Sequence, residues 1–215
     1  GRYVTLPLAV RSWARAFWTL LKMGHCAPTF MSSILRVCGR RKADWLVRLA
    51  SALPGGIGNT GGECGGITSP LMLLGLLYGL SSVEGGLPLV FDRSNNHIEK
   101  FRNHRCTVLC REIRGTPNRV LPCIRAVVYT GAICADTLCG ETRNVIPGEA
   151  REAYCRLYAA FNRCGFHCAQ TVLRHLDGHI PAEPLLLDAG SAFLGGTSFA
   201  GMTCSALTAG AMALG

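Results

Sequence analysis

The sequence lacks the short motifs that mark the common metal, cofactor and nucleotide sites. It has no Cys-x-x-Cys pair, which argues against zinc-ribbon and thioredoxin-like sites, and no Cys-x-x-Cys-His, which excludes covalently attached c-type haem. It also has no Gly-x-x-x-x-Gly-Lys, no Gly-x-Gly-x-x-Gly after a strand and no His-Glu-x-x-His. With no sign of a nucleotide site or a hydrolase, the sequence does not favour a substrate-converting enzyme.

Charged residues are scarce as well, at 16% of the chain, and only three of the 22 basic residues are lysines. The net charge of +9 is spread along the chain, without the basic stripe and interleaved aromatic side chains typical of nucleic-acid-binding proteins. We therefore expect the arginine-rich surface to face solvent, a protein partner or a second copy of the chain. Electrostatic affinity for RNA within a larger particle stays open as an alternative.

A long hydrophobic run is also absent. The best candidate, residues 70–83, is shorter than the about 20 apolar residues that a membrane-spanning helix needs. Nevertheless, 49% of the residues are hydrophobic and the mean hydropathy is +0.26, which indicates a heavily buried chain. We therefore expect residues 70–83 to form a buried core helix, and we expect no membrane span.

What the sequence does contain is an internal repeat. A Gly-Gly pair, a later glycine and a cysteine recur 140 residues apart, and a His-Cys-Ala triplet recurs 142 residues apart. The first set is His25-Cys26-Ala27, Gly55-Gly56, Gly61 and Cys64, and the second is His167-Cys168-Ala169, Gly195-Gly196, Gly201 and Cys204. We therefore predict a first cysteine-rich repeat over residues 1–125, a connecting segment over 126–148 and a second, shorter repeat over 149–215.

Both copies have the same predicted elements. An amphipathic helix ends at a glycine before the His-Cys-Ala triplet, a second helix follows, and a third segment leads through a glycine-rich turn into a helix that begins at the cysteine. Residues 140–148 are typical of a linker, and the clearest strand-favouring run, 127–130, fits a helix equally well. The predicted fold is therefore mostly α, a duplicated helical repeat in which glycine-rich turns lead into cysteine-started helices.

The cysteines at predicted helix starts are the candidate reactive or ligand residues. Free backbone N–H groups and the positive end of the helix dipole favour a thiolate, so we expect a lowered pKa at Cys64 and Cys204. The same N–H groups can hydrogen-bond the sulfurs of an iron–sulfur cluster. Cys26 and Cys168 follow a helix break and are also predicted helix starts. Simple burial is the alternative for any cysteine, and it is favoured for Cys38, Cys134, Cys139 and Cys155.

Two pairs of cysteines, Cys106/Cys110 and Cys164/Cys168, are four residues apart, so that on a helix each pair would share one face. This spacing suits two ligands of one metal, and it suits equally a helical hairpin joined by disulfides. We interpret His25 and His167, which neighbour the repeated cysteines, as capping or core histidines rather than ligands.

These residues resemble a known family, the redox-active proteins named for their Cys, Gly-Cys-Ala-x-x-Gly, Cys, Cys pattern. Residues 165–173 resemble the family's first-cysteine helix, residues 55–68 its central turn and helix, and residues 110–113 its third-cysteine motif. The helix motif departs from the family because Ser69 and Ala209 stand where a glycine is usual, and Ser205 replaces the glycine after Cys204.

The resemblance implies a set of ligands in each repeat. The first repeat has all four: Cys26, Cys64, Cys110 and Cys123. The second has Cys168 and Cys204, which mark a candidate second site. Split-Soret cytochromes contain a domain similar to this family whose cysteines hold a two-iron, two-sulfur cluster, which implies a similar cluster in the first repeat.

The main hypothesis is therefore a redox-type protein that binds a small iron–sulfur cluster, or another thiolate-ligated metal, and transfers electrons. The alternative is a structural accessory subunit of a large, organellar assembly that keeps the fold without the centre and needs no cofactor. The arginine-rich surface and the high apolar content favour this alternative. We expect either a reducing bacterial cytoplasm or, after removal of a transit peptide, an organelle.

Overall fold

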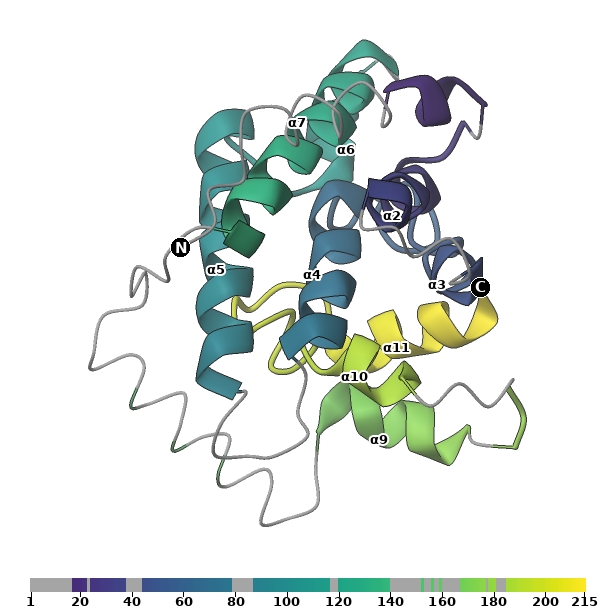
Figure 1. Ribbon diagram of the computed structural model, residues 1–215, viewed down its shortest axis with the longest axis vertical. Coiled ribbons are helices and arrows are strands. Elements are labelled where there is room, and N and C mark those ends of the chain that lie inside the picture. Colours follow the sequence, from purple (N-terminus) through teal and green to yellow (C-terminus); the bar gives the residue numbers. More distant parts are fainter. Residues whose placement is uncertain are drawn as a thin grey trace. The chain divides into compact units, whose positions relative to one another are not determined.

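Helices make up most of the described chain (Figure 1). The computed structural model describes residues 17–22, 24–37, 44–78, 87–116, 120–139, 152, 156, 159, 167–176, 178–180 and 185–215. Among these residues there is no β-strand, although Glu63 and Leu109 form an isolated antiparallel bridge. The predicted mostly helical fold is confirmed, and the strand-favouring run 127–130 is helical.

The described helices range from five to 20 residues in length. In chain order they are α2 (Cys26–Val37), α3 (Asp44–Leu49), α4 (Gly65–Tyr78), α5 (Leu87–Arg105), α6 (Cys110–Arg114), α7 (Val120–Cys139), α9 (Cys168–His175), α10 (Leu186–Gly190) and α11 (Ser205–Leu214). Residues 17–22 are also helical, and Gly24, with a φ of +69°, ends this segment before α2, as the sequence predicts.

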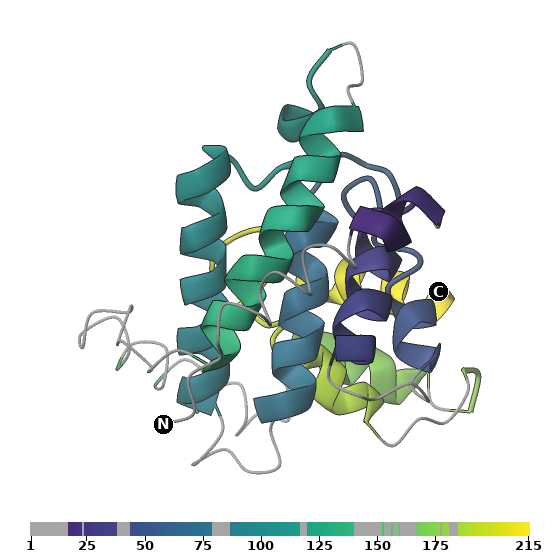
Figure 2. The same ribbon diagram turned by 45° about the horizontal axis from the view of Figure 1, so that its top comes forward.

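Two compact units divide the chain. The described residues of the first unit fall within Gly1–Pro70, His97–Gly140 and Leu214–Gly215, and those of the second within Leu71–Asn96 and Glu141–Ala213. In the first unit, α2 packs against α3 and α7, and α6 packs against α7, as can be followed in Figure 2. In the second unit, α9 packs against α10. The predicted boundaries of the two repeats stay a prediction.

The helix α4 is apolar on almost every side and is buried over most of its length, which confirms the buried helix predicted for residues 70–83 as far as Tyr78; residues 79–83 lie outside the described residues. Pro70 lies inside it and has no N–H to offer the carbonyl of Gly66 one turn earlier. Two side chains satisfy this carbonyl instead. Thr130 Oγ1 donates to Gly66 O at 3.0 Å, and His97 Nε2 lies 3.0 Å from the same oxygen, so it donates as the neutral ring.

The glycine-rich segment 55–59 forms a left-handed turn. Its three glycines have positive φ, and so do Ile57 at +49° and Asn59 at +62°. Non-glycine residues in this conformation cost about 1–2 kcal/mol each, and backbone hydrogen bonds such as Gly62 N to Gly56 O at 3.1 Å hold the turn. A Cβ at Gly56 would clash with Gly62 N and lie 2.5 Å from Gly62 O, on the other arm of the turn, so no larger residue fits there.

Residues 195–199 adopt the same conformation. All five have positive φ, although Thr197, Ser198 and Phe199 are not glycines. The backbone hydrogen bonds also recur 140 residues later, because Met202 N donates to Gly196 O at 2.9 Å. The two turns therefore share one backbone geometry, whereas duplication of whole repeats stays a prediction.

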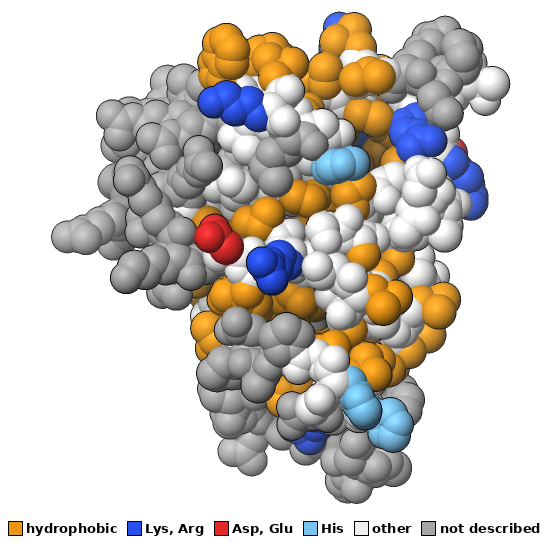
Figure 3. Space-filling view, turned by 90° about the vertical axis from the view of Figure 1, so that its right-hand side faces the viewer, with side chains coloured by type: hydrophobic (Ala, Val, Ile, Leu, Met, Phe, Trp, Pro, Cys, Tyr) orange, Lys and Arg blue, Asp and Glu red, His pale blue; other side chains and the backbone are white. Residues whose placement is uncertain are grey.

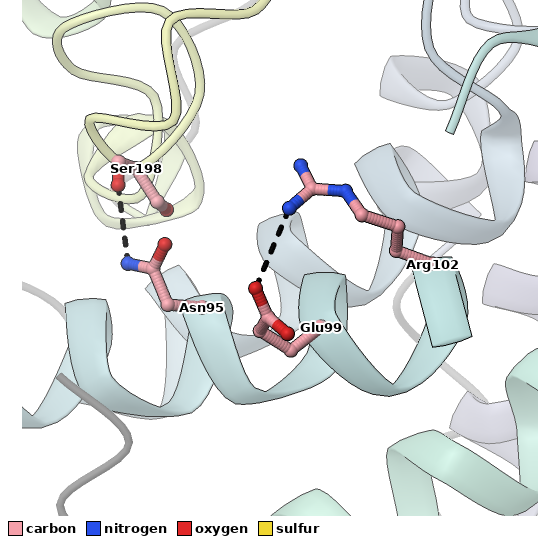
Figure 4. Close-up of polar contacts among 4 residues, drawn as sticks. All are labelled: Asn95, Glu99, Arg102 and Ser198. Atoms are coloured by element: carbon pink, nitrogen blue, oxygen red, sulfur yellow. Dashed lines mark hydrogen bonds and ion pairs between the residues drawn. The ribbon is translucent and has the colours of Figure 1, made fainter. Parts of the chain in front are cut away.

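Contacts with α5 hold the second turn. Asn95 Nδ2 donates to Ser198 O at 3.1 Å (Figure 4) and to Phe91 O at 2.9 Å. The rings of Phe91 and Phe199 lie with their centroids 4.9 Å apart. These contacts offset the cost of placing non-glycine residues in the left-handed conformation.

Large hydrophobic side chains also reach the surface, and Figure 3 shows patches of them between few charged groups on one face. In the first unit, Trp18 is 63% exposed and Val120 is 71% exposed. None of the described helices is both long enough and apolar enough to cross a membrane.

The structure corrects one pairing. Cys106 and Cys110 do not share a helix face, because α5 ends at Arg105 and α6 begins only at Cys110. Cys106 has a φ of +62° and is exposed, whereas Cys110 is buried. The helix α5 also covers the proline- and asparagine-containing residues 87–96.

Several predictions fall on residues that the structure does not describe. These are the linker 140–148, most of the amphipathic helix of the second repeat, the side chain of Cys139, and Cys38, Cys155 and Cys164. Cys134 is buried, as predicted.

Candidate functional site

Four cysteines of the first unit line one cavity of about 750 Å³: Cys26, Cys64, Cys110 and Cys123. Most of the other lining side chains are apolar, among them Leu20, Leu21, Ile113, Val120, Ile124 and Val127. The cysteines that the sequence groups into one set are therefore brought to one place. Their role as ligands stays a prediction.

The starts of α2 and α4 bring Cys26 and Cys64 together. Gly65 permits this approach, since a Cβ there would lie 2.7 Å from Cys26 Sγ and 3.0 Å from Ala27 Cβ. Cys64 directly precedes α4, and the N–H of Gly66 donates to its Sγ at 3.4 Å. The structure thus confirms that a free N–H at this helix start reaches the sulfur.

The segment after the glycine-rich turn places Cys110 beside Cys64. Cys64 N donates to Val108 O at 2.9 Å, next to the antiparallel bridge between Glu63 and Leu109. Cys110 is the residue after this bridge and the first residue of α6. The short extended pairing therefore aligns the starts of α4 and α6.

The helix α7 supplies the fourth thiol. Cys123 lies in its first turn and is half-buried. Because α7 packs against both α2 and α6, its first turn reaches the cavity that the cysteines of those helices line.

Burial governs the ionisation of these thiols. It raises the pKa of Cys110 to about 11 and also raises the pKa of Cys64 and of Cys123. Charge on Cys26 raises the pKa of each of the other three, and both Cys110 and Cys123 raise that of Cys64. The lowered pKa predicted for Cys64 is therefore wrong for the free thiol, since desolvation and neighbouring thiols outweigh the hydrogen bond from Gly66.

Two arginines that the sequence analysis did not select lie near these thiols. Arg114 lines the cavity, donates Nη1 to Asn59 Oδ1 at 3.1 Å and hydrogen-bonds Cys110, which lowers the pKa of that thiol against the effect of burial. Its spacing of four residues from Cys110 was the available signal. Arg105, the last residue of α5, interacts with two of the thiols. No local pattern reveals Arg105, because its position depends on how α5 packs.

The four thiols do not form a compact shell for a single ion. The part of the chain that the structure describes contains no group of three or more His, Cys, Asp or Glu side chains that could hold one metal ion. Each of the four cysteines is a free thiol.

The candidate second site has a different environment. Cys168 begins α9 and is half-buried, while Cys204 precedes α11 and is exposed. His167 caps α9, because its Nδ1 accepts from Gln170 N at 3.3 Å, and its Nε2 donates to Ser191 O at 3.2 Å. This confirms the interpretation of His167 as a capping histidine, whereas a site at the two cysteines stays a prediction.

A comparison with known families agrees with the resemblance of the cysteine motifs. The family described as "Putative redox-active protein (C_GCAxxG_C_C)" matches residues 24–146, which is more than half of the chain. The chain belongs to this family. Its match includes all four cysteines that line the cavity. Comparisons with curated proteins and with solved structures find no match.

Proposed function

We propose that this member of the family is an electron-transfer protein whose Cys26, Cys64, Cys110 and Cys123 hold an iron–sulfur cluster with two irons and two sulfides. The observation that carries the proposal is that these thiols line one cavity although they belong to four separate parts of the chain. The family description supports redox activity in general, and the cysteine cavity supports a thiolate-ligated centre as its seat.

The donor set suits a cluster better than a single ion. Iron–sulfur clusters are held by four cysteine thiolates, and Cys26, Cys64, Cys110 and Cys123 would supply them here. The described residues offer no tight group for one ion, yet the four thiols border a common cavity. A cluster contains several atoms, so thiols that line a cavity can bind it without all surrounding a single metal ion.

The surroundings also suit a centre of this kind. The free thiols resist ionisation because they are buried beside one another, and bound metal cations provide the positive charge that deprotonates a coordinating thiol. The N–H of Gly66 and the guanidinium of Arg114 donate toward two of the sulfurs. Such hydrogen bonds tune the potential of a thiolate-bound centre.

Within this proposal the chain holds, shields and tunes the centre. A bound cluster would supply reversible one-electron chemistry. The four thiolates fix its position, the apolar side chains of α7 and of residues 17–22 limit the access of water, and Arg114 balances charge at Cys110.

Anaerobic purification followed by visible absorption and by iron and sulfide analysis tests the proposal. We expect a coloured protein with two irons and two sulfides per chain. The variant Cys64→Ser should lose the colour, and the matched control Cys204→Ser, at the equivalent helix start of the second unit, should keep it. A colourless, metal-free protein in which every thiol reacts with a thiol reagent contradicts the proposal and favours the accessory-subunit alternative.

A further inference from the structure

Two nitrogens of the Arg105 guanidinium are shielded from solvent and have no hydrogen-bond partner among the residues that the structure describes. These two nitrogens are Nε and Nη2. Arg105 is the last residue of α5 and is half-buried as a whole. A positive charge whose nitrogens are partly shielded from solvent is stabilised by an anion beside it, because part of its hydration is lost. The position of Arg105 therefore indicates that an anion belongs next to it.

The groups that act on Arg105 point to the cysteine cavity. Negative charge on Cys64 or on Cys123 stabilises its guanidinium, as does charge on Tyr129, whereas Arg125 opposes it. In the described part of the chain, no carboxylate acts on this guanidinium. The anion that Arg105 lacks is therefore to be found on the side of the two thiols.

We propose that Arg105 is the counter-charge of an anionic, thiolate-bearing centre held at Cys64 and Cys123, so that the cavity is built for negative charge rather than for neutral thiols or disulfides. This inference rests on the proposed function. A two-iron cluster held by four thiolates would carry net negative charge, and one electron supplied by a redox partner would make it more negative. A fixed guanidinium nearby stabilises both forms, and the reduced form more.

The reduction potential of the loaded protein tests this role. Replacement of Arg105 by methionine removes the charge and keeps an unbranched side chain. At a fixed potential, we expect Arg105→Met to shift the ratio of reduced to oxidised protein about tenfold toward the oxidised form, which is about 59 mV for one electron. The charge-conserving variant Arg105→Lys should keep the ratio of reduced to oxidised protein close to that of the wild type.

Arg102 provides the matched control. It lies on the same helix, its Nη1 already pairs with Glu99 Oε1 at 3.4 Å (Figure 4), and its side chain is 45% exposed. Arg102→Met removes the same formal charge and should leave the potential unchanged, because exposed charges are screened by solvent. An equal shift in both variants would mean that net charge, not the position of Arg105, sets the potential, and would overturn the proposal.

A second measurement does not require a cluster. In the metal-free, reduced, full-length chain, the thiols can be modified either by a dianionic aromatic disulfide or by a neutral one. We expect Arg105→Met to lower the ratio of the anionic to the neutral rate about tenfold, and Arg102→Met to leave it unchanged. A wild-type chain that never takes up iron refutes the proposed function. In that case the ratio of the anionic to the neutral rate still tests whether Arg105 makes the cavity attract anions. An unchanged ratio and potential in Arg105→Met overturn the inference.

Discussion

The two glycine-rich turns have one backbone geometry, yet the cysteines that follow them lie in different surroundings. Cys64 is 5% exposed and lines a cavity with three other thiols, whereas Cys204 is exposed. The turn therefore presents a cysteine at the start of a helix but does not by itself bring other thiols to it. The first unit adds α6 and α7, which carry Cys110 and Cys123 to the same cavity.

The residue after each cysteine differs in a way that fits this contrast. In the first unit it is Gly65, and the space of its missing side chain is next to Cys26 Sγ. In the second unit it is Ser205, whose buried hydroxyl accepts a hydrogen bond from Thr197 N at 3.2 Å. The start of α4 thus leaves room for the thiol of Cys26, whereas the start of α11 is hydrogen-bonded to the preceding turn through Ser205.

The largest expected effect on iron content comes from replacing Gly65, the first residue of α4, by serine, the residue that begins α11. In Gly65→Ser the new Cβ would meet Cys26 Sγ at 2.7 Å, so this thiol must move away from the cavity. We expect the iron and sulfide content to fall at least about tenfold, as misplacing one ligand of a metal site does.

The reverse change is its control. Ser205→Gly should leave the iron content unchanged and cost about 1 kcal/mol of stability through the lost hydrogen bond. Equal iron content in Gly65→Ser and the wild type would show that Cys26 is not a ligand.

The next effect separates the turns from the centre. Gly56→Ala and Gly196→Ala both place a Cβ in a left-handed residue and against backbone atoms, Gly62 N and Gly62 O (2.5 Å) in the first turn and Met202 O (2.8 Å) in the second. We expect each to lower the free energy of unfolding by about 2–4 kcal/mol, measured by chemical denaturation. The control Gly58→Ala, which meets nothing within 4 Å, should cost only about 1 kcal/mol. Only Gly56→Ala should also reduce the iron content. An equal loss of iron in Gly196→Ala would contradict the view that only the first turn supports the cysteine cavity.

A smaller effect depends on pH and compares one buried histidine in each unit. Burial lowers the pKa of His97 and of His167 to about 4. In the unfolded chain these histidines bind a proton below pH about 6.5, whereas in the folded chain they stay neutral until the pH approaches 4. Their contribution to the free energy of unfolding is therefore fully present above pH about 6.5 and is lost as the pH falls toward 4. We expect a loss of roughly 2–3 kcal/mol for each histidine by pH 4.

Denaturation curves of His97→Gln and His167→Gln across this range measure the effect, because glutamine keeps an N–H donor and does not titrate. Each variant should flatten the pH dependence by a similar amount, since burial lowers the pKa of both histidines to about 4. Parallel curves for the variants and the wild type would contradict the assignment.

The smallest effect concerns the anchor of the second turn. Asn95→Ala removes the hydrogen bond to Ser198 O and should cost about 1 kcal/mol, measured by thermal or chemical unfolding. The iron content should not change. Its counterpart is Thr60→Ala in the first turn, where Thr60 Oγ1 donates to Gly56 O at 2.6 Å. A loss of iron in Asn95→Ala would show that the second unit contributes to the centre.

The sequence predicts the helical fold and the grouping of four cysteines because glycine, cysteine and hydrophobic spacing are local signals. Gly55-Gly56 marks a turn, and the apolar residues 71–75 are all buried in a helix. The loss of helix at Cys106 and the position of Arg105 were not predictable, since both depend on how α5 ends and packs. The raised pKa of Cys64 was missed for the same reason, because burial and neighbouring thiols arise only from the tertiary fold.

The most direct test of the central claim is a crystal of the anaerobically purified protein measured at the iron absorption edge. The account predicts anomalous peaks for two irons inside the cavity of the first unit, each bonded to two of the sulfurs of Cys26, Cys64, Cys110 and Cys123. A crystal with no iron in this cavity, or with iron bound elsewhere, would contradict it.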